Sequence, residues 1–157
     1  MKKLFDCNLP LDIIVTVNDG KIVLTSCKHS TQQRKLSCTV VGSPDDEKVS
    51  HAIFSWLDDY TRKIPPKIAL PFKLPERGFS YKVLEQLQKI PFGKTCSYKE
   101  IALNTGTPMA ARAVGSACGA NPFPLFIPCH RVIKTNGTIG GFAFGPAMKK
   151  LLLDFER

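Results

Sequence analysis

A cysteine beside a histidine is the part of this chain best suited to nucleophilic chemistry. Cys129 and His130 lie in the segment Ile-Pro-Cys-His-Arg-Val-Ile, residues 127–133, in which a proline restricts the backbone before the thiol. A cysteine becomes a nucleophile where a base or a cation favours its thiolate and a rigid segment leaves it partly accessible. Asn121 precedes Cys129 by eight residues, and a carboxylate, Glu156, follows it by 27. The pattern predicts a reactive cysteine with a histidine as its neighbouring base.

Two short helices are expected upstream of this pair. Ser97 and Glu100 have the spacing of a capping box, which predicts a helix that ends near Asn104. A turn containing glycine and proline separates it from a second helix, over residues 109–120. Two short helices joined by a tight turn indicate a helix-turn-helix. Residues 135–138 then predict a turn between short extended segments, as in a wing, and a last helix begins at the following proline, Pro146.

The second of these helices consists almost wholly of small residues around Arg112. Small side chains let a helix approach a narrow DNA groove closely, and one projecting arginine can fill the gap left by an extruded nucleotide. The alternative is a packed internal helix whose arginine reaches solvent. Tyr98, in the first turn of the first helix, can donate a hydrogen bond or contact a phosphate. Its alternative is an ordinary surface aromatic.

The N-terminal half reads as a small sheet with one amphipathic helix. Strands are expected over residues 11–17, 21–27 and 36–41, and the Asn-Asp-Gly turn between the first two predicts a hairpin. Ser43 and the following proline and acidic residues predict the start of a helix that continues to Arg62-Lys63. The expected organisation is a scaffold domain over 1–63, a linker with four prolines over 64–75, and a DNA-binding domain over 76–157.

Charge favours a polyanionic partner for the C-terminal half. The chain has 22 basic and 13 acidic side chains, a net charge of +9. Residues 76–157 contain 11 basic and 5 acidic side chains, a net charge of +6, whereas residues 1–75 carry +3. A basic domain of this kind is typical of nucleic-acid binding, although a solvated basic surface is the simpler alternative.

Six cysteines without a C-x-x-C pair indicate reduced thiols in an intracellular protein. Polar residues near the N-terminus interrupt any signal peptide, and no apolar run has transmembrane length. We therefore expect a cytoplasmic protein, or a nuclear one in a eukaryote. No metal site is expected, since the candidate ligands match no zinc spacing: Cys7, Cys27, His29, Cys38 and His51.

Four segments together resemble the O6-alkylguanine-DNA alkyltransferase family. They are Ile90–Tyr98, the Ala-Arg-Ala-Val-Gly run of residues 111–115, Asn121–Pro124, and Pro128–Val132. The match covers residues 76–157, about half of the chain. The family implies an α+β protein in which a small ribonuclease-H-like sheet-plus-helix domain precedes a winged helix-turn-helix domain.

The resemblance implies a role for each site residue. Cys129 would accept the alkyl group, and His130 would help to deprotonate it through a bridging water, because neighbours in an extended segment point in opposite directions. Glu156 would hold His130, and Asn121 would brace the turn that carries the cysteine. Tyr98 would donate a proton or hydrogen bond to guanine N3.

The resemblance also implies contacts to DNA and to the flipped base. Arg112 would occupy the space that the base leaves, and the expected DNA-binding residues beside it are Ser97, Lys99, Ala110, Ala111, Gly115 and Thr135. The substrate-binding residues besides Tyr98 would be Pro124, Val132 and Ala143. The main-chain carbonyls of Cys129 and Val132 would read the exocyclic amine, and the Ala143 amide would contact O6.

The implied function is direct reversal of DNA damage. The alkyl group of O6-alkylguanine, and by extension of O4-methylthymine, would pass irreversibly to Cys129 after base flipping from the minor-groove side of duplex DNA. The protein would act once, as a monomer, without a cofactor. Phe142 and Phe144 replace the hydroxyl-bearing and glycine residues of members that tolerate bulky adducts, which predicts a tight pocket that favours methyl over benzyl.

Three alternatives are weaker. Lesion-binding relatives without activity replace the acceptor cysteine, commonly by tryptophan, whereas Cys129 is present here. A helix-turn-helix transcription factor would need more long polar side chains on its recognition helix to read base edges. A cysteine hydrolase is disfavoured by the adjacent Cys-His order and by the absence of nucleophile-elbow glycines.

Overall fold

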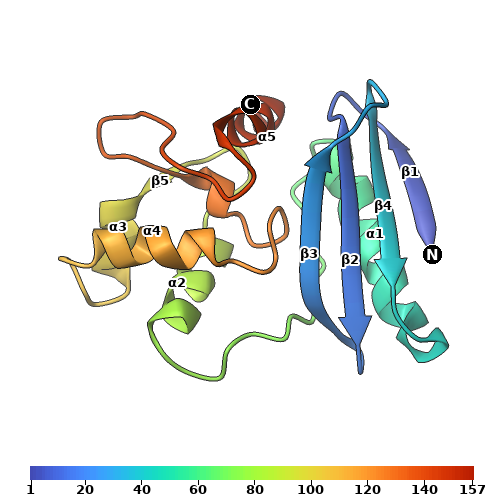
Figure 1. The fold of residues 1–157 in the computed structure, drawn as a ribbon, viewed down its shortest axis with the longest axis horizontal. Coiled ribbons are helices and arrows are strands. Elements are labelled where there is room, and N and C mark those ends of the chain that lie inside the picture. Colours follow the sequence, from blue (N-terminus) through green and yellow to red (C-terminus); the bar gives the residue numbers. More distant parts are fainter. The chain divides into compact units, whose positions relative to one another are not determined.

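The computed structural model describes all 157 residues, which form two compact units, Met1–Lys73 and Leu74–Arg157 (Figure 1). The sequence predicts this α+β class, and the structure confirms it. No helix in either unit combines the length and the apolar character needed to cross a membrane.

Unit 1 is a mixed four-stranded sheet with one long helix. Its strands are β1 (Lys2–Asp6), β2 (Leu11–Asn18), β3 (Lys21–His29) and β4 (Lys35–Val41), in the spatial order β1-β4-β2-β3. β2 and β4 run parallel, and the other pairs are antiparallel. Helix α1 (Glu47–Thr61) follows a short 3-10 turn, η1 (Pro44–Asp46), and buries Ile53 and Leu57 in the core.

Alternation along β2 explains why this sheet has one apolar face. Leu11, Ile13, Val15 and Val17 are buried, while the residues between them are not. The predicted hairpin between β2 and β3 turns through Asp19 and Gly20, whose φ angles are 49° and 70°. The Gly20 amide also donates to Asp46 Oδ1 at 2.8 Å, which ties the hairpin to the start of α1.

Two features of unit 1 were not expected from the sequence. β1 forms an edge strand on β4, although two lysines and an aspartate flank its apolar residues. In addition, the end of the expected linker pairs with β3, since the Ile22 amide donates to the Pro71 carbonyl at 2.7 Å and Lys73 N donates to Ile22 O at 2.8 Å. The extended backbone that the prolines impose therefore adds to the sheet.

Unit 2 contains the helix-turn-helix. Helix α2 (Phe79–Gln88) packs against α3 (Tyr98–Asn104) and α4 (Ala111–Gly119), and α3 contacts α4 (Figure 1). The predicted capping box is present: the Glu100 amide donates to Ser97 Oγ at 3.1 Å, and the Ser97 amide donates to Glu100 Oε2 at 2.7 Å. This cap fixes the first residue of α3, Tyr98.

The segment after α4 differs from the expected wing. A 3-10 turn, η2 (Cys129–Arg131), leads into β6 (Val132–Ile133), which pairs in parallel with β5 (Cys96–Ser97). The predicted turn closes through a bond from Lys134 N to Thr138 O at 2.8 Å, but no strand follows it. The expected second extended segment was wrong, because β6 finds its partner before α3 instead. The chain ends in α5 (Pro146–Glu156).

Candidate active site

Cys129 is the first residue of η2 and is 3% exposed. Its amide donates to the Ile127 carbonyl at 2.8 Å, which fixes the backbone that carries the thiol. Asn121 donates through Nδ2 both to that same carbonyl, at 2.9 Å, and to Cys129 Sγ, at 3.2 Å. Asn121 therefore braces the turn and also contacts the sulfur, which favours the thiolate.

The expectation of a water between Cys129 and His130 assumed that the two residues lie in an extended segment, and this assumption was wrong. Cys129 and His130 lie in a 3-10 turn, not in an extended segment, so the alternation of side chains along a strand does not apply to them. His130 is fully buried, and its Nε2 lies 2.7 Å from Glu156 Oε1. Its Nδ1 is buried without a hydrogen-bond partner. Glu156 therefore fixes the proton on Nε2 and leaves Nδ1 as the basic nitrogen.

Glu156 also binds Arg131, the residue after His130. The Arg131 guanidinium donates through Nε to Glu156 Oε2 at 2.8 Å and through Nη2 to Oε1 at 3.0 Å. Its Nη1 donates to the Ile90 carbonyl at 2.8 Å. Because Glu156 is the last residue of α5, this bidentate pair anchors the end of that helix beneath the Cys-His turn.

Burial and hydrogen bonding shift the pKa values of all three groups. Burial alone would raise the pKa of Glu156, but the hydrogen bonds from His130 and Arg131 lower it to about 2. Burial lowers the pKa of His130, so the imidazole is neutral near pH 7. Burial also raises the pKa of Cys129, while the Asn121 hydrogen bond and the Lys149 ammonium oppose that rise. The resting pair is a thiol beside a neutral imidazole.

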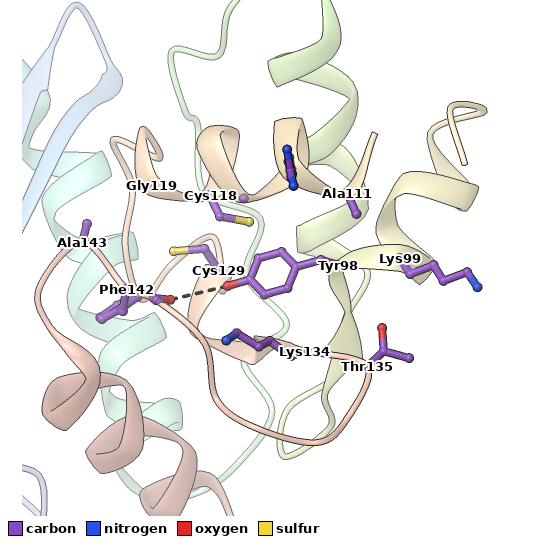
Figure 2. Close-up of a pocket in the computed structure, with 13 residues that line it drawn as sticks. Tyr98, Lys99, Ala111, Cys118, Gly119, Cys129, Lys134, Thr135, Phe142 and Ala143 are labelled. Atoms are coloured by element: carbon purple, nitrogen blue, oxygen red, sulfur yellow. Dashed lines mark hydrogen bonds between the residues drawn. The ribbon is translucent and has the colours of Figure 1, made fainter. Parts of the chain in front are cut away.

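Cys129 opens onto a cavity of about 610 Å³, within the range of small-molecule pockets (Figure 2). Three cations lie at its edge and no carboxylate lines it. The lining residues are Tyr98, Lys99, Ala111, Arg112, Gly115, Cys118, Gly119, Cys129, Lys134, Thr135, Gly141, Phe142 and Ala143.

Tyr98 extends from α3 across this cavity, and its hydroxyl donates to the Gly141 carbonyl at 3.4 Å (Figure 2). A buried lysine, Lys149 of α5, donates to Tyr98 Oη at 3.3 Å, to Gly141 O at 3.1 Å and to the Val132 carbonyl at 2.5 Å. Burial raises the pKa of Tyr98, followed by the effect of the thiols of Cys118 and Cys129. Tyr98 therefore keeps its proton and is suited to donate a hydrogen bond.

The structure brings most of the expected site residues to this cavity. Those that line it are Tyr98, Lys99, Ala111, Arg112, Gly115, Cys129, Thr135 and Ala143. His130, Asn121 and Glu156 are buried close to Cys129. Four expected residues do not line the cavity: Ser97 caps α3, Ala110 precedes α4, and Pro124 and Val132 are buried.

Sequence reasoning gave no role to Lys149, Arg131, Cys118 or Lys134. Lys149 could have been found from its position three residues before Leu152 and seven before Glu156, on the buried stripe of α5. A lysine in such a stripe needs polar partners, which directs attention to nearby carbonyls. Arg131 follows the Cys-His pair directly, but nothing in its sequence context indicates that it binds Glu156.

The fold and site define a class: a helix-turn-helix protein whose pocket is lined by a buried cysteine, followed in the chain by a histidine that is hydrogen-bonded to a buried carboxylate. The family model described as "6-O-methylguanine DNA methyltransferase, DNA binding domain" matches residues 78–157. A methylated-DNA–protein-cysteine methyltransferase from Saccharolobus islandicus is 38% identical over 149 residues, which are 94% of this chain and 90% of that protein. A probable one from Acanthamoeba polyphaga mimivirus is 42% identical over 107 residues, 68% of this chain and 67% of its own.

Solved structures agree with these relatives. The chain resembles Mycobacterium tuberculosis OGT in complex with DNA with a TM-score of 0.70 and 27% identity, over 92% of each chain. An O6-methylguanine DNA methyltransferase from Methanococcus jannaschii gives a TM-score of 0.61 and 31% identity, over 92% of this chain and 87% of that one. The chain belongs to the methylated-DNA–protein-cysteine methyltransferase family.

Proposed function

We propose that Cys129 is the alkyl acceptor in this protein. The protein is a methylated-DNA–protein-cysteine methyltransferase, which repairs O6-alkylguanine by direct transfer of the alkyl group to its own cysteine. The observation that carries the assignment is the buried Glu156–His130 pair, with 2.7 Å between Oε1 and Nε2, next in the chain to the cavity-lining thiol that Asn121 contacts.

Deprotonation of Cys129 starts from the neutral state of both groups. Because His130 Nδ1 has no hydrogen-bond partner in the protein, a bridging water passes the thiol proton to it, while Nε2–H stays on Glu156 Oε1. The imidazolium that forms is stabilised by the Glu156 carboxylate, and the thiolate by the Asn121 amide and the Lys149 ammonium. Sulfur then displaces guanine O6 from the alkyl carbon, forming one S–C bond as one C–O bond breaks.

The flipped guanine occupies the cavity lined by Tyr98 and Ala143. Tyr98 donates a hydrogen bond to N3 as the purine leaves, and its raised pKa favours this over full proton transfer. The Ala143 amide contacts O6, and the Cys129 carbonyl reads the exocyclic amine. The Val132 carbonyl also accepts from the exocyclic amine, but only through the lone pair that does not already accept from Lys149.

DNA binds on the side that α4 presents. Arg112 is exposed at the cavity edge and fills the space left by the base, while Ala111 and Gly115 let the helix approach the minor groove. Lys99 and Thr135, both at the cavity edge, contact phosphates. Ser97 and Ala110, the two other residues expected to contact DNA, are the N-cap residues of α3 and α4 and position the first turns of these helices. The OGT complex with DNA supports this partner.

The product is a thioether at Cys129, whose carbon is a poor electrophile toward water. Each molecule therefore acts once, as a monomer without a cofactor or metal, and the N-terminal domain of residues 1–63 serves as its scaffold. Thiols suit a reducing compartment, so we place the protein in the cytoplasm, or in the nucleus of a eukaryote.

Intact mass spectrometry with an O6-methylguanine duplex tests the assignment. One methylene is expected per chain, located on Cys129 by peptide mapping, and Cys129→Ala should bind the duplex without gaining mass. Methylation at another residue, or none after prolonged incubation with excess duplex, contradicts the proposal.

The cavity is suited mainly to a methyl adduct. Phe142 lines it, while Phe144 packs against Phe142 with ring centroids 5.7 Å apart and does not itself line the cavity. Phe144 therefore restricts the pocket by holding Phe142. Single-turnover rates on O6-methylguanine should exceed those on O6-benzylguanine, and Phe144→Gly should raise the benzyl rate selectively.

A further inference from the structure

The alkyl-acceptor cavity contains a second thiol that the repair reaction does not use. Cys118 lies in the last turn of α4 and is 8% exposed, and it lines the same cavity as Cys129. Figure 2 shows both side chains among the residues that line this cavity, Cys118 on α4 and Cys129 below that helix in the view. Of the three cysteines in unit 2, the third, Cys96, lies outside the cavity beside Glu100.

The two thiols are close enough for Cys129 to affect the pKa of Cys118. Burial raises the pKa of Cys118 to about 12, and the thiol of Cys129 contributes to that rise. The Lys149 ammonium opposes the rise at both cysteines. One cation and two thiols are thus buried in the same part of unit 2, and only Cys129 also has a hydrogen-bonding amide and a neighbouring base in the sequence.

We propose that Cys118 is a redox partner of Cys129 and that a peroxide converts the pair to a disulfide that switches off repair reversibly. The inference rests on the proposed function of Cys129, because the same activation by His130 produces the thiolate that attacks the peroxide. The residues that line the cavity include the exposed Lys99 and Arg112, so the cavity is open to solvent and a molecule as small as hydrogen peroxide can enter.

The chemistry balances in two steps. The Cys129 thiolate attacks one peroxide oxygen, and with one proton the O–O bond breaks to give a sulfenic acid and water. The Cys118 sulfur then attacks the sulfenic sulfur, forming the S–S bond and releasing a second water. Two thiols lose two hydrogens in total, and one peroxide is reduced to two waters.

The disulfide has a consequence that oxidation of a single cysteine lacks. Without a second thiol, excess peroxide converts a sulfenic acid to a sulfinic acid, which thiol reductants do not reverse. A bond to Cys118 traps the first oxidation state instead and returns the acceptor when reductant is restored. Each molecule accepts only one alkyl group and does not regenerate its acceptor. The disulfide therefore preserves the Cys129 thiol for the single transfer that the molecule can perform.

The test begins with reduced wild-type protein, whose methyl transfer to Cys129 is measured first. The same preparation is treated with one equivalent of hydrogen peroxide, alkylated with N-ethylmaleimide, and mapped without reduction. We expect a loss of two hydrogens, a linked peptide pair containing Cys118 and Cys129, and methyl transfer that is lost and then restored by dithiothreitol.

Two variants sharpen the result. Excess hydrogen peroxide is used for the variants and for a parallel wild-type sample, because a sulfinic acid needs two peroxides per thiol. In Cys118→Ala, Cys129 should then reach the sulfinic acid, and dithiothreitol should recover less than a fifth of that variant's own starting activity; Cys118→Ser should behave alike. Cys96→Ser, the matched control, should form the disulfide and recover as the wild type does.

Two outcomes overturn the proposal: Cys118 that still reacts with N-ethylmaleimide while Cys129 is oxidised, or a recovery in Cys118→Ala equal to that of the wild type. Failure of the reduced protein to accept methyl contradicts the proposed function instead.

Discussion

Glu156 holds two side chains, and the Gly93 amide as well, with one carboxylate, and this makes it the residue on which the site depends most. Its Oε1 accepts from both His130 and Arg131, and its Oε2 accepts from Arg131 Nε. An amide in place of the carboxylate can accept at only one of its two terminal atoms. It also lacks the charge that stabilises the imidazolium formed when Cys129 loses its proton.

Glu156→Gln should therefore lower the methyl-transfer rate about 100-fold, the lower end of the usual effect of general-base catalysis. Single-turnover transfer from an O6-methylguanine duplex measures it. Asp154→Asn is the matched control, because Asp154 lies on the same helix but pairs with Lys150 and Arg157 at the surface. Equal rates in the two variants would show that Glu156 does not support the histidine.

The same carboxylate should make the protein sensitive to acid. The pKa of Glu156 is lowered to about 2, so its contribution to stability is complete above its ordinary pKa of 4.5 and is lost as the pH falls toward 2. His130, whose pKa is lowered from 6.5, acts in the same direction, because the unfolded chain takes up a proton below 6.5 before the folded one does. The free energy of unfolding should fall by up to about 3 kcal/mol from Glu156 alone.

Urea denaturation at pH 7, 5 and 3 measures this fall. Glu156→Gln removes the titrating group, so its stability should be lower at pH 7 and should change less with pH. Parallel curves for the variant and the wild type would assign the acid sensitivity to other groups.

At the scale of the element, α4 combines two requirements that usually conflict. It must approach DNA closely, which calls for small side chains, and it must remain a helix, which glycine weakens. Gly115 lines the cavity, and a Cβ added there would lie 3.9 Å from Tyr98 Cε1, an ordinary contact. The position thus has space for a methyl group but little for a longer side chain.

Two substitutions at Gly115 separate these requirements. Gly115→Ala should stabilise the protein by about 0.5–1 kcal/mol through helix propensity and retain methyl transfer. Gly115→Leu should fold but lose at least tenfold in transfer rate, because its side chain enters the space of the flipped base. Thermal unfolding and single-turnover transfer distinguish the two effects, and full activity in Gly115→Leu would show that the base does not pass this face of α4.

Local sequence signals predicted the elements that local interactions determine. The capping box at Ser97 and the hairpin through Asp19 and Gly20 depend on residues a few positions apart, and both are present. β1 was missed because charged residues surround its one buried side chain, so that only its pairing with β4 makes it a strand. The burial of Lys149 likewise depends on carbonyls from two other segments, which no local pattern reveals.

At the scale of the whole molecule, the two units differ in charge as well as in fold. Residues 74–157 carry 11 basic and 5 acidic side chains, a net charge of +6, and residues 1–73 carry the remaining +3. The excess charge lies in the unit that contains the cavity, and Lys99, Arg112 and Lys134 lie at the cavity edge. Electrostatic attraction should therefore bring DNA to the unit that reacts with it.

Salt dependence gives a measure of that attraction. Each phosphate that the protein neutralises contributes about −0.9 to the slope of log K against log salt concentration. Lys99→Ala should remove one contact, so its slope for duplex binding should be smaller by about 0.9, with binding weakened alike on damaged and undamaged DNA. Lys48→Ala is the matched control, since Lys48 is exposed on α1 in the other unit. Titrations from low to high salt compare both with the wild type. An unchanged slope in Lys99→Ala, or an equal change in Lys48→Ala, would mean that the charge of the molecule as a whole attracts DNA, independent of the cavity edge.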